Sequence, residues 1–249
     1  TSTGRRGGVT VRIVVITFLL LALATLASAT PACITGQTLN QYLPAVLPDG
    51  CYVGDKWFRN FSFFSDGHSA PQDQHIHVTV LGTAPFFGLQ FAAKEASNGW
   101  HVFAGGFDQE SFITYEVAIL SGPDRIYGAI LEAADVQVQG TGTYLQIEKQ
   151  LCPGAAWSPG CAGLVTISKT FTSDSSFWND VGGWFPTGYT LVGVRDIVRI
   201  HTAKGPGNQA TIDGYISNRW AQSPEPAGYV LLGSGLVALG FLRRRLRKR

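Results

Sequence analysis

The sequence of 249 residues contains no methionine, so we expect the true N-terminus of the protein to lie upstream of Thr1. It also lacks the short motifs of common active sites: there is no Gly-x-Ser-x-Gly elbow, no glycine-rich phosphate loop and no His-Glu-x-x-His pair. No repeat with the period of a solenoid or propeller occurs. A catalytic site, if the chain has one, would have to be assembled from dispersed residues.

Charged residues are few, at 14%, and they are unevenly placed. Nine of the 19 Lys and Arg residues lie before residue 30 or after residue 223, whereas 16 of the 17 Asp and Glu residues lie between them. Residues 30–223 therefore carry a net charge of −6, although the whole chain carries +2. Nucleic-acid binding needs clustered Lys and Arg against the phosphates, so this charge distribution excludes it.

The first 29 residues have the three parts of a secretory signal peptide. Arg5, Arg6 and Arg12 precede or open an apolar run at 13–26, and small residues stand at 27–29. The arginine pair is followed by two glycines and lacks the rest of a twin-arginine export motif. We therefore predict export of a mature chain through a signal peptide at residues 1–29.

Only four cysteines are present, and all lie in the exported part, where an oxidising compartment favours disulfides. Three pairings are possible. We predict Cys33 with Cys51 and Cys152 with Cys161, because each pair closes a short loop rich in Gly, Pro or turn residues. A zinc site of four thiolates is the alternative, but such sites usually carry Cys-x-x-Cys knuckles, which this chain lacks. We expect no metal ion and no cofactor.

Short β-branched and aromatic runs between turn residues make up most of residues 30–223, without a long amphipathic helix. This pattern predicts a single all-β domain, an antiparallel and jelly-roll-like β-sandwich. Leu39, Tyr42, Leu43 and Val46 recur at helical spacing, which predicts a short N-terminal helix. Strands are predicted from residue 56 onward and over 75–81, 86–92, 100–103, 111–120, 125–138, 142–150, 163–171, 191–201 and 210–220.

The C-terminal region 224–249 has three parts in order: the motif Pro224-Glu225-Pro226, an apolar stretch at 227–242 and a basic cluster. The basic cluster consists of Arg243, Arg244, Arg245, Arg247, Lys248 and Arg249. Sixteen apolar residues at 1.5 Å each span roughly 24 Å, which is short against a hydrocarbon core of about 30 Å. By the positive-inside rule the basic cluster stays cytoplasmic and the motif lies outside the inner membrane. We predict a transmembrane sorting helix, with an ordinary tail anchor as the alternative.

This tail resembles the PEP-CTERM sorting signal of Gram-negative bacteria, which is the substrate of exosortase, a polytopic membrane transpeptidase or protease. The resemblance covers residues 224–249. It implies recognition at the Pro-Glu-Pro motif, removal of the apolar and basic segments, and release or transfer of the domain to the cell surface. Such systems usually accompany exopolysaccharide production, so exopolysaccharide is a second expected partner beside the processing enzyme.

A second resemblance concerns the domain, which is similar to uncharacterised PEP-CTERM proteins. These proteins have no agreed activity, so the resemblance implies an architecture and no chemistry. The matching residues are Cys33, Gly50-Cys51, Gly54-Asp55-Lys56, Asn60-Phe61-Ser62-Phe63, Cys152, Cys161 and Val194-Arg195-Asp196-Ile197.

His75 and His77 are the candidate metal ligands, because two residues apart in a strand would face the same side. Asp66, His68 and Asp73 lie just upstream. The Glu that a cupin motif requires shortly after the pair is absent, which favours a structural or solvent-facing role for both histidines.

Aromatic residues gather at 171–189, where Trp178 and Trp184 are the candidate glycan contacts. On an exposed loop these rings would stack on sugars, whereas in the core they would simply pack. We predict a non-enzymatic cell-surface or extracellular-matrix protein, glycan-associated and held in the inner membrane before processing. The alternative is a secreted glycan hydrolase, which needs two carboxylates across the bond. The candidates for that pair are Asp108, Glu110 and Glu116, or Asp174 and Asp180, none with diagnostic spacing.

Overall fold

The computed structural model describes residues 30–83, 86–93, 95, 99–103, 105–120, 122 and 124–222. The predicted signal peptide, the Pro224-Glu225-Pro226 motif, the apolar stretch after it and the basic cluster lie outside these residues. Within the described part, no helix is long and apolar enough to cross a membrane.

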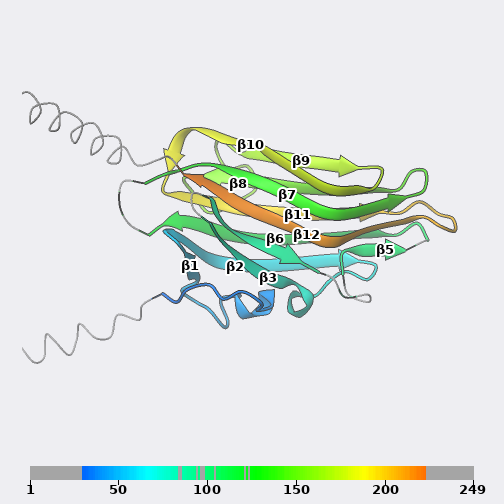
Figure 1. The fold of residues 1–249 in the computed structure, drawn as a ribbon, viewed down its shortest axis with the longest axis horizontal. Coiled ribbons are helices and arrows are strands. Elements are labelled where there is room, and N and C mark those ends of the chain that lie inside the picture. The colour runs from blue at the N-terminus through cyan, green and yellow to red at the C-terminus, as the bar shows by residue number, and fades with distance from the viewer. Residues whose placement is uncertain are drawn as a thin grey trace, which may run out of the picture. The chain divides into compact units, whose positions relative to one another are not determined.

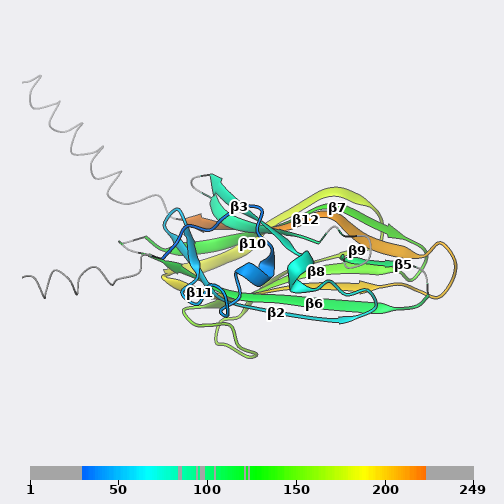
Figure 2. The same cartoon turned by 90° about the horizontal axis from the view of Figure 1, so that it is seen from below.

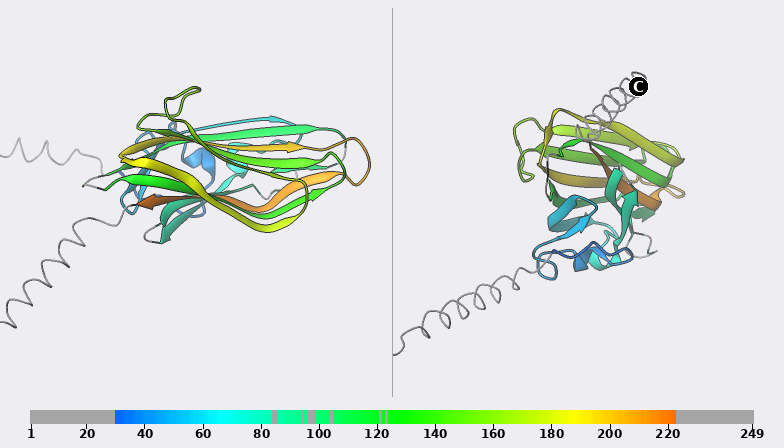
Figure 3. Two further views of the ribbon diagram at one scale, coloured as in Figure 1. Left: turned by 90° about the horizontal axis from the view of Figure 1, so that it is seen from above. Right: turned by 60° about the vertical axis from the view of Figure 1, so that its left-hand side comes forward.

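Two antiparallel sheets face each other and enclose the core (Figures 1 and 3). Sheet A has the strand order β1-β2-β6-β11-β8-β9, and sheet B has the order β10-β7-β12-β4-β3, with β5 paired to β12. The chain crosses repeatedly between the sheets, as it does from β6 to β7 and from β11 to β12. This arrangement confirms the predicted antiparallel β-sandwich. The strands are β1 Cys51–Val53, β2 Lys56–Gly67, β3 His77–Thr83, β4 Phe86–Ala92, β5 His101–Phe103, β6 Asp108–Ile119, β7 Ile126–Gln139, β8 Tyr144–Pro153, β9 Val165–Phe171, β10 Ser175–Tyr189, β11 Leu191–His201 and β12 Gln209–Gln222.

Alternation of side chains along each strand decides which residues reach the core. In β8, Leu145, Ile147 and Leu151 are fully buried between the sheets, while Gln146 and Glu148 lie on the outer face. The same alternation runs through the other central strands. The largest fully buried side chains include Trp100, Trp220, Tyr42, Tyr115, Phe58, Phe61 and Phe91.

The predicted N-terminal helix does not form as an α-helix. Leu39–Gln41 make one short 3-10 helix, η1, and the chain then continues in turns toward β1. Leu39 and Tyr42 are buried, whereas Val46 is 63% exposed. Leu43 is half-buried against the core, so three of the four residues at helical spacing anchor this segment although no α-helix forms.

The two predicted disulfides, Cys33–Cys51 and Cys152–Cys161, are both present. The first ties the segment before η1 to the start of β1 in sheet A. The second links two cysteines nine positions apart at the end of β8, and the loop between them projects from the outer face of sheet A (Figure 2, the yellow-green loop). The chain therefore fixes that loop covalently against one sheet.

Candidate functional site

The outer face of sheet A carries a group of aromatic side chains around one arginine. Phe64 of β2 lies directly opposite Phe112 of β6, and their rings stack with centroids 5.4 Å apart. The guanidinium carbon of Arg195, on β11, lies 3.7 Å from the Phe112 ring centroid and 4.5 Å from that of Trp157. We call Phe64, Phe112, Arg195 and Trp157 the aromatic–arginine cluster.

Trp157 reaches this face because the Cys152–Cys161 loop lies directly over β11. The contact depends on Gly193, since a Cβ at that position would overlap the backbone of Ala156 and Trp157. The loop and the strands enclose a shallow depression of about 300 Å³. It is lined by Ser62, Phe63, Phe64, Phe112, Thr114, Trp157, Pro159 and Arg195.

Arg195 is held by rings and not by an acid. Within the described residues its guanidinium has two ring contacts and no ion pair. Burial lowers the pKa of Arg195, and the positive charge of Arg199 lowers it further. The negative charges of Glu110 and Glu148 raise this pKa and so offset part of the decrease. The group stays cationic, because an arginine pKa lies far above neutral. Its N–H donors are therefore oriented by stacking and remain available to a ligand in the depression.

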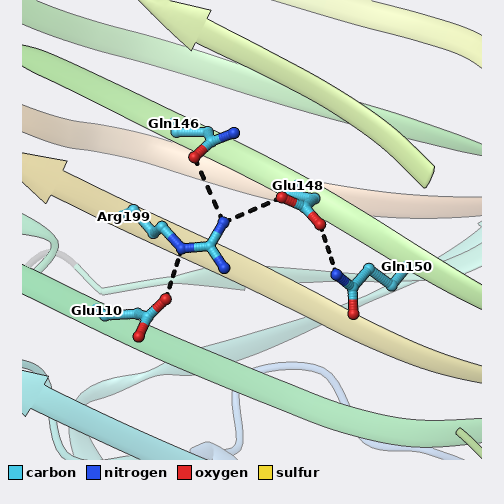
Figure 4. Close-up of polar contacts among 5 residues, drawn as sticks. All are labelled: Glu110, Gln146, Glu148, Gln150 and Arg199. Atoms are coloured by element: carbon cyan, nitrogen blue, oxygen red, sulfur yellow. Dashed lines mark hydrogen bonds and ion pairs between the residues drawn. The ribbon is translucent and has the colours of Figure 1, made fainter. Parts of the chain in front are cut away.

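A polar network continues the face beside the cluster (Figure 4). Arg199 of β11 donates from Nε to Glu110 Oε1 at 2.5 Å, and from Nη1 to Glu148 Oε2 at 3.0 Å and Gln146 Oε1 at 3.4 Å. Gln150 donates to the other Glu148 oxygen at 2.6 Å. These side chains come from β6, β11 and β8, so the network binds three neighbouring strands together across the surface.

The carboxylates suggested for hydrolysis all have structural partners or lie apart. Asp108 pairs with His201 at 2.7 Å, Glu110 with Arg199, and Glu116 with Arg59 at 2.8 Å. The Arg199 guanidinium occupies the space between Glu110 and Glu148, where a scissile bond would have to lie.

Asp174 accepts a hydrogen bond from the Val138 backbone N–H at 2.7 Å. Asp180 lies in β10 of sheet B, whereas Asp108, Glu110 and Glu116 lie in β6 of sheet A. Each of these three β6 carboxylates is therefore paired with a basic side chain.

The histidine pair does not share a strand face. His75 ends the 3-10 helix η2 (Asp73–His75), and His77 is the first residue of β3. The His75 Nε2 atom lies 3.6 Å from Glu95 Oε2, while His77 is exposed. Among the described residues, no group of three or more His, Cys, Asp or Glu side chains is placed to hold a metal ion.

Most of the aromatic stretch at 171–189 forms strand β10, and its two tryptophans have different surroundings. β10 is the edge strand of sheet B, paired with β7. Trp184 is 55% exposed over Gly128, whereas Trp178 is half-buried and meets the core residue Phe171 edge-on at 6.0 Å.

Sequence reasoning missed the aromatic–arginine cluster altogether. Phe64 and Phe112 lie in runs that predict ordinary strands, and Arg195 and Trp157 are far from them in sequence. The sequence did contain one signal: strand alternation places Phe64 and Phe112 on the outer face of the sheet. An apolar ring on the polar face of a strand indicates a contact surface.

Comparison with known proteins gives weak likenesses of fold. No family model matches the chain, and no curated protein matches its sequence. The structure of TmCBM61 in complex with β-1,4-galactotriose has a TM-score of 0.30 and 9% identity, covering 66% of this chain and 88% of that chain.

Two other solved structures are similarly distant. A family 11 carbohydrate-binding module from Clostridium thermocellum, in complex with a β-1,3-1,4-mixed-linked tetrasaccharide, has a TM-score of 0.22 and 9% identity over 76% of this chain and 97% of that chain. A family two carbohydrate esterase from Cellvibrio japonicus has a TM-score of 0.21 and 11% identity over 66% of this chain and 34% of that chain. TM-scores of this size support no inference about function.

Proposed function

We propose that this protein is an exported, non-enzymatic surface protein that binds a glycan on the outer face of sheet A. The observation that carries the proposal is Arg195, a cation held between two rings without an acidic partner among the described residues, at the edge of a depression of about 300 Å³. The exposed ring of Phe64 beside this cation supports an interaction surface on the sheet face.

The chemistry of the cluster suits a sugar ring. Phe64 is 53% exposed and offers a ring face for the C–H side of a pyranose. Arg195, Ser62 and Thr114 supply donors and acceptors around the same depression for hydroxyl or carboxylate oxygens. Glu148, Gln146 and Gln150 extend the polar surface along β8, so a chain of several sugars could lie across the strands.

Retention on polysaccharides by affinity electrophoresis tests the proposal, using the exported protein and both neutral and uronate polymers. Phe64→Ala should weaken retention about tenfold, or about 1.4 kcal/mol, on any polymer that holds the wild type. Arg195→Lys should also weaken it, because lysine keeps the charge but not the planar, ring-stacked donors.

Phe103→Ala is the matched control, because Phe103 is equally exposed, at 53%, but lies on β5 in sheet B. The proposed site is wrong if Phe64→Ala and Phe103→Ala have equal effects on retention. It is also wrong if only Trp184→Ala changes retention, because the glycan would then bind outside the aromatic–arginine cluster.

We further propose that the protein reaches the surface through the C-terminal signal, by processing near Pro224-Glu225-Pro226 by an exosortase-type enzyme. The order of motif, short apolar stretch and basic cluster supports this, and the two disulfides agree with an oxidising destination. Mass analysis of protein recovered from the cell surface should show a chain without Arg249. Glu225→Ala should leave the unprocessed chain in the inner membrane, and a surface form that still ends in Arg249 would indicate a plain tail anchor.

A further inference from the structure

Three polar side chains meet inside the sandwich, where apolar residues surround them. Lys149 of β8 and Asp196 of β11 point inward from sheet A, and Asn218 of β12 points inward from sheet B. Lys149 and Asn218 are 0% exposed and Asp196 is 2% exposed. A long cationic side chain is almost never fully buried unless it has a specific partner, so this site requires an explanation.

The three groups contact one another in a closed arrangement. Lys149 Nζ contacts Asn218 Oδ1 directly and lies 3.1 Å from Asp196 Oδ1. The second Asp196 oxygen accepts a hydrogen bond from Asn218 Nδ2 at 2.8 Å. A single carboxyl group therefore touches both the lysine amine and the asparagine amide.

Aromatic residues form the walls of this site. Lys149 Nζ lies 5.4 Å from the centroid of the Trp220 ring, and Tyr115 lies beside Asp196. Both rings are buried, with Trp220 fully enclosed. The site is thus shielded from solvent on the side of both sheets.

Burial also shifts the pKa values of the two ionisable groups in opposite directions. It lowers the pKa of the Lys149 amine and raises the pKa of the Asp196 carboxyl, and in each case the attraction between the two only partly offsets the effect. Both shifts favour a neutral amine and a protonated carboxyl. A neutral amine has the lone pair that a nucleophile needs.

We propose that Lys149 and Asn218 join in an intramolecular amide bond, with Asp196 transferring the proton between them. Lys149 Nζ contacts Asn218 Oδ1, the oxygen bonded to the carbon that it would attack. The two groups come from opposite sheets, and the carboxyl group of Asp196 touches both. Proximity and fixed orientation of this kind raise a reaction rate by several orders of magnitude. An unactivated amide reacts slowly with an amine, so the step needs an increase of this size.

The step balances without an oxidant, a reductant or a further reactant. The Lys149 Nζ lone pair attacks Asn218 Cγ and forms the new C–N bond. One oxygen of Asp196 takes a proton from Nζ, and the other gives a proton to Nδ2. The Cγ–Nδ2 bond then breaks, ammonia leaves, and Asp196 ends in its initial state as general acid and base. The product amide has no charge, which removes the cost of a buried ammonium.

Tryptic peptide mapping of the exported full chain, after reduction of its disulfides, tests the proposal. Trypsin does not cut after an acylated lysine, so peptide 126–169 should remain uncut at Lys149 and carry peptide 205–219 as a branch. Its mass should be that of the two peptides less one ammonia, about 17 Da. Separate peptides 126–149, 150–169 and 205–219 from a folded wild-type chain would overturn the proposal.

Two other products are distinguishable in the same experiment. Loss of ammonia from peptide 205–219 without a branch would indicate a cyclic imide at Asn218, and it would overturn the amide. A branch to the peptide of Asp196, with loss of one water, about 18 Da, would identify a different bond and also overturn it.

Variants then test the role of Asp196. Asp196→Asn should yield the unlinked peptides, because the amide cannot exchange protons between the reacting groups. Glu132→Gln is the matched control: Glu132 is also a buried acid and contacts Ser217 and Arg219, so its variant should stay linked. A linked Asp196→Asn chain would overturn the assigned proton transfer. If that variant fails to fold, the wild-type map alone decides whether the bond exists.

Discussion

Tyr42 shows how a single buried hydroxyl couples this fold to pH. Its side chain is 1% exposed, meets Phe61 edge-on at 5.6 Å, and donates a hydrogen bond to the Ile34 carbonyl oxygen at 2.7 Å. Burial raises the pKa of Tyr42 from its usual value of 10.0 to about 12, although the backbone hydrogen bond acts in the opposite direction. The folded chain therefore strongly prefers the neutral phenol.

The stabilisation linked to Tyr42 should disappear in alkaline solution. Because the folded pKa lies above the unfolded one, the contribution is complete below pH 10 and is lost as the pH rises toward 12. Urea denaturation at about pH 9 and about pH 11 should show a fall in the free energy of unfolding that is larger for the wild type than for Tyr42→Phe. Tyr52→Phe, at a residue 38% exposed, should behave as the wild type, and identical losses in all three chains would contradict the prediction.

Strand alternation in the sequence also indicates that Lys149 and Asn218 are buried polar residues. Lys149 lies at the same strand parity as the inward residues Ile147 and Leu151, and Asn218 at the parity of Ile216 and Trp220. A charged or amide residue on the apolar face of a strand signals a specific partner. Local sequence patterns do not show how the two sheets pack against each other, and this packing brings the partners together.

At the scale of elements, the sequence predicted the strands with strong alternation and missed the irregular one. β4 and β11 have the predicted bounds, because each is a run rich in β-branched or aromatic residues that is flanked by turn residues. β10 was not among the predicted strands, since Gly182, Gly183 and Pro186 interrupt its pattern. Two register shifts against β7 accommodate these interruptions, and as an edge strand β10 tolerates them.

The disulfide loop over β11 yields a prediction for the element as a whole. A methyl group at Gly193 would overlap the loop backbone at Ala156 and Trp157, so Gly193→Ala should lift the loop and separate Trp157 from Arg195. We expect a destabilisation of about 1–3 kcal/mol from overpacking and a loss of glycan retention like that of Phe64→Ala.

Gly82→Ala is the matched control for this loop, because a Cβ at Gly82 in β3 would meet nothing within 4 Å. Its thermal denaturation and its retention on the same polysaccharide should equal those of the wild type. Full retention by a folded Gly193→Ala chain would show that the loop does not shape the binding face.

At the scale of the whole molecule, both candidate sites depend on topology that local sequence patterns do not encode. Phe64, Phe112 and Arg195 become neighbours because β6 pairs with both β2 and β11. Lys149 and Asn218 meet because β8 and β12 lie in opposite sheets. The alternation of each strand was predictable, but the order of strands within a sheet depends on long-range pairings.

The covalent links of the fold act over different lengths of chain. The two disulfides span 18 and 9 positions, whereas the proposed amide spans 69 positions and joins the two sheets. In the chain-entropy model a cross-link stabilises by restricting the unfolded state, and the effect grows with loop length. The amide should therefore contribute the most, about 4 kcal/mol in that model.

Chemical denaturation in the presence of a reductant should isolate this contribution. The double variant Lys149→Met, Asp196→Asn removes the cross-link and leaves no unpaired buried charge, so its free energy of unfolding should be lower than that of the wild type by about 4 kcal/mol. Glu132→Gln provides the comparison for loss of a buried acid without loss of the link. A difference below about 1 kcal/mol between the double variant and the wild type would indicate that packing alone holds the two sheets together.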